Sequence, residues 1–446
     1  MSETSQQLNV ELRSAATTEL PGLPLRPVGG AEAALAVTED GPRLTVAIPE
    51  TSRSEIRWIV DRLVRRLKGS LDYEGLNLAI GDEVDDDTAV ALALDLHGRA
   101  RGSLELEAKS AVVERVASLR PYEELFKSWV DEDPSTRTSL KIAEDVQALG
   151  EAHEHVEAEI LAEEALRERG LNLLLAVGGG SEASPSRLCI ARYNPPGSET
   201  KSPLMLLGKG VTFDTGGINV KPYESFVSMM KNDMAGSALA FALFKALIES
   251  DYPAPLALVL PTCENAIGSR AMRPGALVES YRGHIVRIDH TDAEGRLILA
   301  DGLSYATDII EPSQVICFAT LTTSALVSYG PFATPVHFAT GELKNRLERA
   351  GERCGEDLHF FPERIWHLEA NRDREGDLRN TARLPGNASR GAGSRNAAHF
   401  LRHFTDRPLV HLDIFASTWN WSGEAPGAGY GATGAPLRSL LTALRD

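Results

Sequence analysis

Two carboxylates, Asp292 and Glu294, lie two positions apart in the segment 290–297, which we interpret as the end of a strand leading into a helix. On an extended backbone, side chains two positions apart point to the same side. Two acids on one side repel each other unless a positive charge lies between them, and a divalent cation satisfies both. The pair therefore raises the hypothesis of a metal site, but taken alone it fits a solvated turn that caps the following helix better, because acidic residues commonly precede helices.

Further charged residues follow earlier apolar runs. The run that ends at Leu207 leads into a glycine-rich segment that contains Lys209 and Asp214, and Asp233 comes directly before a predicted helix. Glycines permit tight turns that aim short side chains at one point. Taken singly, Asp233 reads as an ordinary helix cap and Lys209 as an exposed loop lysine.

Taken together, these residues predict a shared site. Four negative charges would meet in one cleft, where one or two dications and nearby lysines could hold them: Asp214, Asp233, Asp292 and Glu294. The set contains no His or Cys, which favours Mn²⁺, Mg²⁺, Co²⁺ or an oxygen-ligated Zn²⁺. Because carboxylates can bridge, we favour two metals over one. Two metals about 3.5–4 Å apart can share one water and polarise a carbonyl.

The elements that must position these residues alternate along the second half of the chain. Apolar runs typical of strands recur at 203–207, 256–260, 285–288, 315–321, 336–339 and 409–415. Helical stretches lie between or after them, at 236–249, 297–307, 342–354, 396–404 and 437–444. This alternation predicts an α/β fold in which a mixed sheet is covered by helices on both faces. Ligands in such folds bind beyond the strand ends.

A chain of 446 residues predicts more than one domain. We expect a loose N-terminal segment at 1–30, a small accessory α/β domain at 31–130, a connecting helical region at 131–169 and a catalytic domain at 170–446. In the accessory domain, 54–68 predicts a basic amphipathic helix. The segment 89–94 fits either a short buried strand or the end of a helix.

The composition of the chain limits the classes of partner that we expect the protein to bind. Lys and Arg total 46 against 63 Asp and Glu, and the net charge of −17 argues against a nucleic-acid partner held through its phosphates. Four separated cysteines without a CxxC pair fit buried, reduced thiols. The first 20 residues are polar, and no stretch approaches the roughly 20 apolar residues of a membrane span. We therefore expect a cytoplasmic protein with no nucleic-acid or membrane partner.

The second half of the chain resembles the leucine aminopeptidase (cytosol aminopeptidase) family, and its peptidase B branch in particular. The resemblance rests on Lys221 and on the segments 208–217, 230–236, 291–297, 319–322, 411–414 and 431–434. Of these segments, 291–297 is the most specific. The N-terminal third matches the family's accessory domain only in position and size.

The resemblance implies a ligand set for two divalent metals, Lys209, Asp214, Asp233, Asp292 and Glu294. Asp214 and Glu294 would bridge the metals, and Lys209 and Asp233 would complete the second, more exchangeable site. Mn²⁺ or Zn²⁺ is expected, with Mg²⁺ and Co²⁺ as alternatives. A lysine ligand must be neutral, and two nearby dications would depress its pKa.

The activity that the resemblance implies is hydrolysis of the N-terminal bond of short peptides. The substrate amine would bind the exchangeable metal, and a metal-bridging hydroxide would attack the carbonyl. Lys221 and Arg296 would be the catalytic pair, Lys221 stabilising the oxyanion and Arg296 holding a bicarbonate ion that acts as base. Met230, Thr320 and Leu321 would contact the substrate. Met230 would favour Leu or Met as the first residue of the substrate, although the position fits a methionine of the hydrophobic core equally well. The family implies a homo-hexamer.

Two positions depart from the family pattern. His290 replaces an Asn and Thr323 replaces a Gly beside the matching segments. We interpret His290 as a tolerated variation rather than a new ligand, and we expect Thr323 to narrow the substrate pocket or alter preference. These positions support the rival hypothesis, a non-catalytic or altered-specificity scaffold or binding protein on the same fold. The intact metal and catalytic positions favour the enzyme.

Overall fold

The computed structural model describes residues 7–14, 23–24, 28, 32–38, 41–68, 75–98, 104–198, 202–382 and 392–445. The chain divides into two compact units that interleave along the sequence. The first contains Met1–Glu123, Arg346–Asp357 and Asn420–Ala443, and the second contains Glu124–Asn345, Leu358–Trp419 and Leu444–Asp446. Each unit is described by itself below. The expected domain boundaries at 1–30, 31–130, 131–169 and 170–446 remain a proposal.

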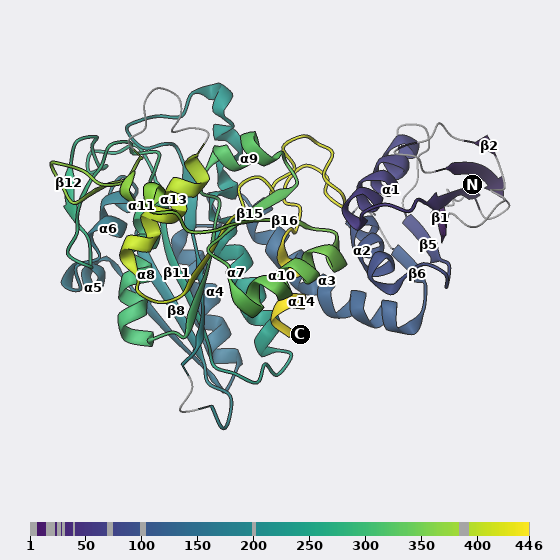
Figure 1. Cartoon of the computed structure of the whole chain (residues 1–446), viewed down its shortest axis with the longest axis horizontal. Helices are drawn as coiled ribbons and strands as arrows, with labels where there is room; N and C mark the ends of the chain where they lie inside the picture. The colour runs from purple at the N-terminus through teal and green to yellow at the C-terminus, as the bar shows by residue number, and fades with distance from the viewer. Residues whose placement is uncertain are drawn as a thin grey trace. The chain divides into compact units, whose positions relative to one another are not determined.

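The first unit contains a six-stranded sheet in the order β2-β3-β4-β1-β5-β6, drawn in purple and blue in Figure 1. Its strands are β1 (Gln7–Ser14), β2 (Leu23–Pro24), β3 (Ala33–Thr38), β4 (Gly41–Ile48), β5 (Gly75–Ile80) and β6 (Leu104–Glu107). β1 runs parallel to both β4 and β5. Within the segment expected to be loose, residues 7–14 form β1, whose alternating Leu8, Val10 and Leu12 are buried.

Helices pack on the apolar face of this sheet. They include α1 (Arg53–Lys68) and α2 (Asp86–His97), and α3 (Ser110–Asp131) begins in this unit. Val10, Val46 and Leu78 from the sheet share one core cluster with Val60 of α1 and Leu92 of α2. The predicted amphipathic helix at 54–68 is confirmed by α1, and the ambiguous segment 89–94 is helical.

Buried charges tie the C-terminal part of the chain into the first unit. Nε of Arg438 donates to Oε2 of Glu123 at 2.7 Å, and its NH1 group donates to Oδ1 of Asp95 at 2.8 Å. Arg57 also pairs with Asp95 at 2.7 Å. Arg438 stands at the start of α14 (Leu437–Arg445), so the sequence-distant helix supplies a counter-charge to the N-terminal sheet and its helices.

The second unit is organised around a nine-stranded sheet. Its main order is β16-β15-β18-β14-β9-β11-β8-β7, and β10 pairs with β11. The strands are β7 (Val156–Leu161), β8 (Arg187–Tyr193), β9 (Leu204–Gly208), β10 (Gly210–Asp214), β11 (Leu256–Asn265), β14 (Gln314–Ala319), β15 (Ala333–His337), β16 (Asp357–Phe361) and β18 (Leu409–Asp413). The neighbours β18, β14, β9 and β11 are parallel, whereas β8, β7 and β15 are antiparallel to their partners.

Helices cover both faces of this mixed sheet, as predicted. The helices of this unit are α4 (Ser139–Ala152), α5 (Glu163–Glu168), α6 (Asn172–Gly178), α7 (Ala235–Ile248), α8 (Gly295–Ile310), α9 (Thr323–Tyr329), α11 (Ile365–Glu369) and α13 (Gly393–Leu401). Most of α10 (Gly341–Cys354) belongs to the first unit. Leu207 and Val259 share a core cluster with residues of α6 and α8. The alternate residues Leu206 and Leu258 are also buried and point to the opposite face, and α7 packs against β9, β11 and β14.

Two expected elements differ from the structure. The segment 131–169, expected to be a connecting helical region, contains the edge strand β7 between α4 and α5. β7 pairs with β8, and of its residues only Glu157 is exposed. The strand expected at 285–288 is β13 (Ile285–Arg287), which lies outside the large sheet in a small sheet with β12 (Leu277–Glu279) and β17 (Leu378–Arg379).

No helix in the described part of the chain is long and apolar enough to cross a membrane.

Candidate metal centre

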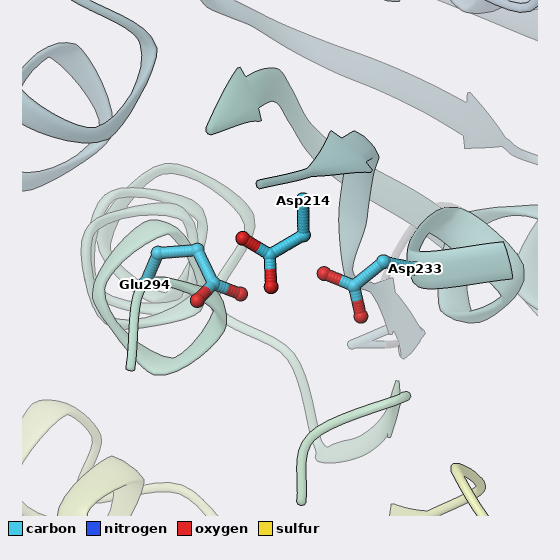
Figure 2. Close-up of side chains that lie close together, drawn as sticks. All are labelled: Asp214, Asp233 and Glu294. Atoms are coloured by element: carbon cyan, nitrogen blue, oxygen red, sulfur yellow. The ribbon is translucent and has the colours of Figure 1, made fainter. Parts of the chain in front are cut away.

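Three acidic side chains from different elements converge in the second unit. Asp214 is the last residue of β10, Asp233 lies in the 3-10 helix Val227–Met234, and Glu294 directly precedes α8. Each offers an oxygen within 4.8 Å of the others, and all three residues are buried. Figure 2 shows the three carboxylates directed toward one another. Buried charges of one sign require compensation, and a dication is one way to supply it.

Lys209 supplies positive charge to this cluster. Its Nζ lies 2.7 Å from Oδ1 of Asp233 and 2.9 Å from Oε1 of Glu294, and it donates to the carbonyl of Thr320 at 2.9 Å. Burial alone would lower the pKa of Lys209, but Asp233, Glu294 and Asp214 outweigh it and raise the pKa. The absence of a side chain at Gly295 makes room for the lysine, because a Cβ there would lie 2.4 Å from its Cε.

Two oxygens of the cluster remain without a hydrogen bond. Among the described residues, Oδ2 of Asp233 and Oε2 of Glu294 are buried and have no partner. A buried carboxylate oxygen without a partner is costly, and metal coordination removes that cost. The cluster therefore fits a hard divalent cation. Burial, with Glu294 and Asp214, also raises the pKa of Asp233 well above its usual range, although Lys209 opposes the shift.

Lys221 and Asp292 form the more open side of the site. Nζ of Lys221 lies 2.8 Å from Oδ2 of Asp214 and also makes an ion pair with Asp292. Burial would raise the pKa of Asp214, but Lys221 and Lys209 hold it below its usual value. Burial and the neighbouring Asp214 raise the pKa of Asp292 to about 8, against the opposing effect of Lys221.

The backbone between Asp292 and Glu294 is not extended, contrary to expectation. Thr291 and Asp292 lie in a turn, and Glu294 has helical angles of φ −78° and ψ −37°. The expectation that side chains two positions apart point to the same side therefore does not apply to Asp292 and Glu294. Glu294 joins the buried carboxylate cluster, whereas Asp292 pairs with Lys221 and lies outside that group.

Arg296 is a buried cation in the first turn of α8. The residue is 8% exposed, and its Nε has no hydrogen-bond partner in the described part of the chain. Burial lowers the pKa of Arg296 to about 10, although Glu294, Asp413 and Asp292 oppose the shift. A guanidinium in this setting can bind a small anion through charge-assisted hydrogen bonds.

The predicted substrate-contacting residues lie on neighbouring segments. Thr320 follows β14, and its Oγ1 donates to Oδ1 of Asp233 at 2.9 Å. Leu321 is partly buried next to it, and N of Leu321 donates to Oδ1 of Asp413 at 3.2 Å. Met230 is buried three positions before Asp233, in the same 3-10 helix.

The two departures from the family pattern are exposed. Nδ1 of His290 accepts a hydrogen bond from N of Asp292 at 3.2 Å, so this nitrogen of the neutral ring is already used. Burial and the positive charge of Lys221 lower the pKa of His290. Thr323 is the first residue of α9 and lies close in sequence to Thr320.

Asn265 and Asn219 support the site but were not predicted from the sequence, and both bond to Thr291 of the matching segment 291–297. Nδ2 of Asn265, at the end of β11, donates to Oδ1 of Asp214 at 2.7 Å and to the carbonyl of Thr291 at 3.1 Å. Thr291 in turn bonds to Asn219, in the loop that carries Lys221. Asn265 could have been predicted as a polar residue that follows the apolar run 256–260, because the ends of strands border ligand sites in this class of fold.

The chain is similar to known proteins of one family. The model described as "Cytosol aminopeptidase family, catalytic domain" matches residues 124–441. A probable cytosol aminopeptidase of Halorhodospira halophila is 40% identical over 304 residues, which cover 68% of this chain and 57% of the relative. One of Syntrophotalea carbinolica is 36% identical over 357 residues, covering 79% of this chain and 68% of the relative. The chain thus spans little more than half the length of the first relative.

Two solved structures are similar over nearly the whole chain. The bottromycin maturation enzyme BotP in complex with Mn is 25% identical, with a TM-score of 0.79, and the match covers 99% of both chains. Another structure of the bottromycin maturation enzyme BotP is 26% identical, with a TM-score of 0.80 and the same coverage. These similarities extend the match to the N-terminal region that the family model leaves out.

Proposed function

The chain belongs to the cytosol aminopeptidase family, and from that premise we propose that it is a metal-dependent aminopeptidase that removes an apolar N-terminal residue, such as Leu or Met, from short peptides. The observation that carries the proposal is the buried cluster of Asp214, Asp233 and Glu294, in which two carboxylate oxygens lack a hydrogen-bond partner among the described residues. A fold that only served as a scaffold would gain nothing from such a cluster, because unpaired buried charge is destabilising.

We propose that two divalent ions bind here, held by Lys209, Asp214, Asp233, Asp292 and Glu294. Oxygen ligands favour Mn²⁺ or Zn²⁺, with Mg²⁺ and Co²⁺ as alternatives. When bound, the ions would supply Lewis acidity, a site for the substrate amine and a bridging water-derived nucleophile. Asp214 and Glu294 would bridge the pair. Lys209 would have to lose its proton to become a ligand, and its salt bridges to Asp233 and Glu294 would be replaced by the metal.

Lys221 would act on the substrate rather than on the metals. Its ammonium lies at the open side of the cluster, between Asp214 and Asp292. Once metals neutralise these two acids, the ammonium would become available to donate to the carbonyl oxygen as negative charge develops there. Before metals bind, Asp214, Asp292 and Glu294 raise the pKa of Lys221 against the effect of burial, so the side chain starts as an ammonium.

Arg296 would hold an anion beside the reacting bond. Its buried guanidinium, with a Nε that lacks a partner in the described chain, suits a bicarbonate ion. The arginine itself cannot take up a proton at neutral pH. The bound bicarbonate would therefore act as the base, and the arginine would fix its position. Met230, Thr320 and Leu321 would contact the first residue of the substrate.

Three finer assignments also belong to the proposal. The matching segments 291–297 and 319–322 suggest the peptidase B branch of the family. Family membership suggests a homo-hexamer, and the lack of a membrane-spanning helix in the described residues is compatible with a cytoplasmic enzyme. Size measurements on the purified protein would test the hexamer directly.

Hydrolysis of leucinamide tests the proposed function. The protein is first stripped with a chelator, and release of ammonia is then measured with and without added Mn²⁺ or Zn²⁺. We expect turnover only in the metal-loaded protein. Full turnover in a rigorously metal-free sample would reject the metal centre. Absence of turnover with every one of the four candidate metals would instead favour the scaffold or binding protein.

A further inference from the structure

Asp413 is a buried carboxylate that the metal cluster does not use. It is the last residue of β18 and pairs with Ala319 at the end of the parallel neighbour β14. Its exposed fraction is 0%. Asp413 is not part of the acidic group that could hold a metal ion. Burying a charged group costs free energy, so interactions other than metal binding must stabilise Asp413.

Hydrogen bonds from the segment 320–322 converge on this carboxylate. N of Leu321 donates to Oδ1 of Asp413 at 3.2 Å, and Oγ1 of Thr322 donates to Oδ2 at 2.7 Å. N of Thr322 also donates to Oδ1 at 3.4 Å. The backbone amides just beyond β14 are thus satisfied by a side chain of the adjacent strand rather than by water. Asp413 fixes the path of the chain at this strand end.

The other side of the same segment contacts the metal centre. The carbonyl of Thr320 accepts from Nζ of Lys209 at 2.9 Å, and its hydroxyl donates to Asp233 at 2.9 Å. The segment 320–322 is therefore held between two buried groups of carboxylates. A shift on the Asp413 side would displace Thr320 relative to Lys209 and Asp233.

We propose that Asp413 is a positioning residue that fixes the substrate-contacting segment 320–322, and this inference rests on the proposed aminopeptidase function. The hydrogen bonds of Asp413 and its charge are separable by substitution. In Asp413→Asn, the amide oxygen still accepts from the two backbone amides, and Oγ1 of Thr322 can accept from the new amide group. The negative charge is lost. In Asp413→Ala, both the hydrogen bonds and the charge are lost.

Kinetics on leucinamide with Mn²⁺-loaded protein test the proposal. For Asp413→Ala we expect a higher KM and a lower kcat, with kcat/KM reduced at least about 30-fold. For Asp413→Asn we expect kcat and KM both within about threefold of wild type, because the hydrogen bonds that hold the segment in place are kept. Metal content, measured by elemental analysis, should equal that of wild type in both variants.

Asp301 provides a matched control in the same unit. It is also 0% exposed, and it accepts hydrogen bonds from N of Leu173 at 2.6 Å and N of Tyr281 at 2.9 Å. Neither partner belongs to the proposed site. Asp301→Asn should therefore lower the thermal midpoint while kcat and KM of the folded protein stay within about twofold of wild type.

The possible outcomes separate this inference from the proposed function. An inactive wild-type protein with every candidate metal rejects the aminopeptidase proposal before any variant is compared. With an active wild type, unchanged kcat and KM in Asp413→Ala would overturn the positioning role, and so would an equal loss in Asp413→Ala and Asp413→Asn. Loss of metal from Asp413→Asn would also overturn it, because the effect would then belong to the metal centre. Should Asp413→Ala fail to fold, Thr322→Val decides: it removes the donor to Oδ2 of Asp413, and unchanged kcat and KM in that variant would overturn the role.

Discussion

Asn219 and Thr291 exchange two hydrogen bonds across the site. N of Asn219 donates to Oγ1 of Thr291 at 2.8 Å, and N of Thr291 donates to Oδ1 of Asn219 at 2.9 Å. Oγ1 of Thr291 also donates to the carbonyl of Gly216 at 2.6 Å. The loop that presents Lys221 is thereby joined to the turn that presents Asp292. These bonds set the distance between the two charged groups.

Asn219→Ala should therefore reduce turnover without removing metal. Loss of the side-chain acceptor leaves N of Thr291 unsatisfied in a buried position, at a cost of about 1–3 kcal/mol. We expect kcat/KM for leucinamide to fall about tenfold through misplacement of Lys221. Asn77→Ala is the control, because Nδ2 of Asn77 bonds to Asn9 in the first unit, away from all site residues. An equal loss of activity in both variants would contradict the positioning effect.

Glu294→Gln should reduce both metal content and turnover. The substitution keeps the shape of the side chain but removes the charge that faces Lys209 and the other two acids. We expect elemental analysis to show loss of at least half the bound metal, with kcat lower by about 100-fold or more. Glu356→Gln changes another buried glutamate, which accepts from Ser439 in the first unit, and should keep wild-type metal content. Unchanged stoichiometry in Glu294→Gln would argue against its bridging role.

Blocking the substrate amine should abolish cleavage. If the amine binds at the carboxylate cluster, acetylation removes both its lone pair and its charge, and the peptide loses its anchor. Mass spectrometry of a leucine-initiated peptide, with and without an N-terminal acetyl group, measures this directly. Cleavage of both peptides at one rate is the result that would exclude an aminopeptidase.

His411 should make the fold sensitive to acid. Burial, and secondarily Arg296, lowers its pKa to about 3, and both ring nitrogens lack partners among the described residues. In the unfolded chain the pKa of His411 is near 6.5, so the unfolded chain binds a proton at this imidazole more readily than the folded protein does. The stability that neutral His411 contributes is therefore fully present above about pH 6.5 and is lost as the pH falls toward 3.

His411→Leu isolates this contribution. Between pH 7.5 and 5, the free energy of unfolding of wild type should fall by about 2 kcal/mol more than that of the variant. Urea unfolding followed by tryptophan fluorescence at the two pH values measures the difference. His337 and His399, which are also buried with lowered pKa values, contribute to both proteins and cancel. If the difference in unfolding free energy between wild type and His411→Leu is the same at both pH values, His411 is not held neutral in the folded protein.

The sequence was most informative where charge followed an apolar run. Lys209, Asp214 and Asp233 each come after or before a strongly patterned element, so their convergence at one sheet edge could be predicted from the order of elements. The local geometry around Asp292 could not be predicted in this way, because a turn rather than extended backbone separates Asp292 from Glu294. Turn conformation there depends on partners such as Asn380, which donates from Nδ2 to the carbonyl of His290 at 2.7 Å.

Two kinds of feature were hidden from sequence reasoning. Asp413 ends an apolar strand and reads as an ordinary strand terminus, and its role appears only when β14 lies beside β18. Pairing of this kind depends on sequence-distant contacts that a local pattern does not encode. The strand β7 was hidden for another reason. Its Glu-rich and Ala-rich composition favours helix, and pairing with β8 overrides that preference.

The ion network around Arg438 also bears on the order in which the protein is made. Its guanidinium reaches Glu123 and Asp95 across 315 and 343 positions of sequence. A ribosome releases the N-terminal sheet long before it adds Arg438, so during most of synthesis those acids lack this partner. Completion of the first unit must therefore wait for the last helix, and a chain stalled before α14 would leave that unit's buried acids short of positive charge.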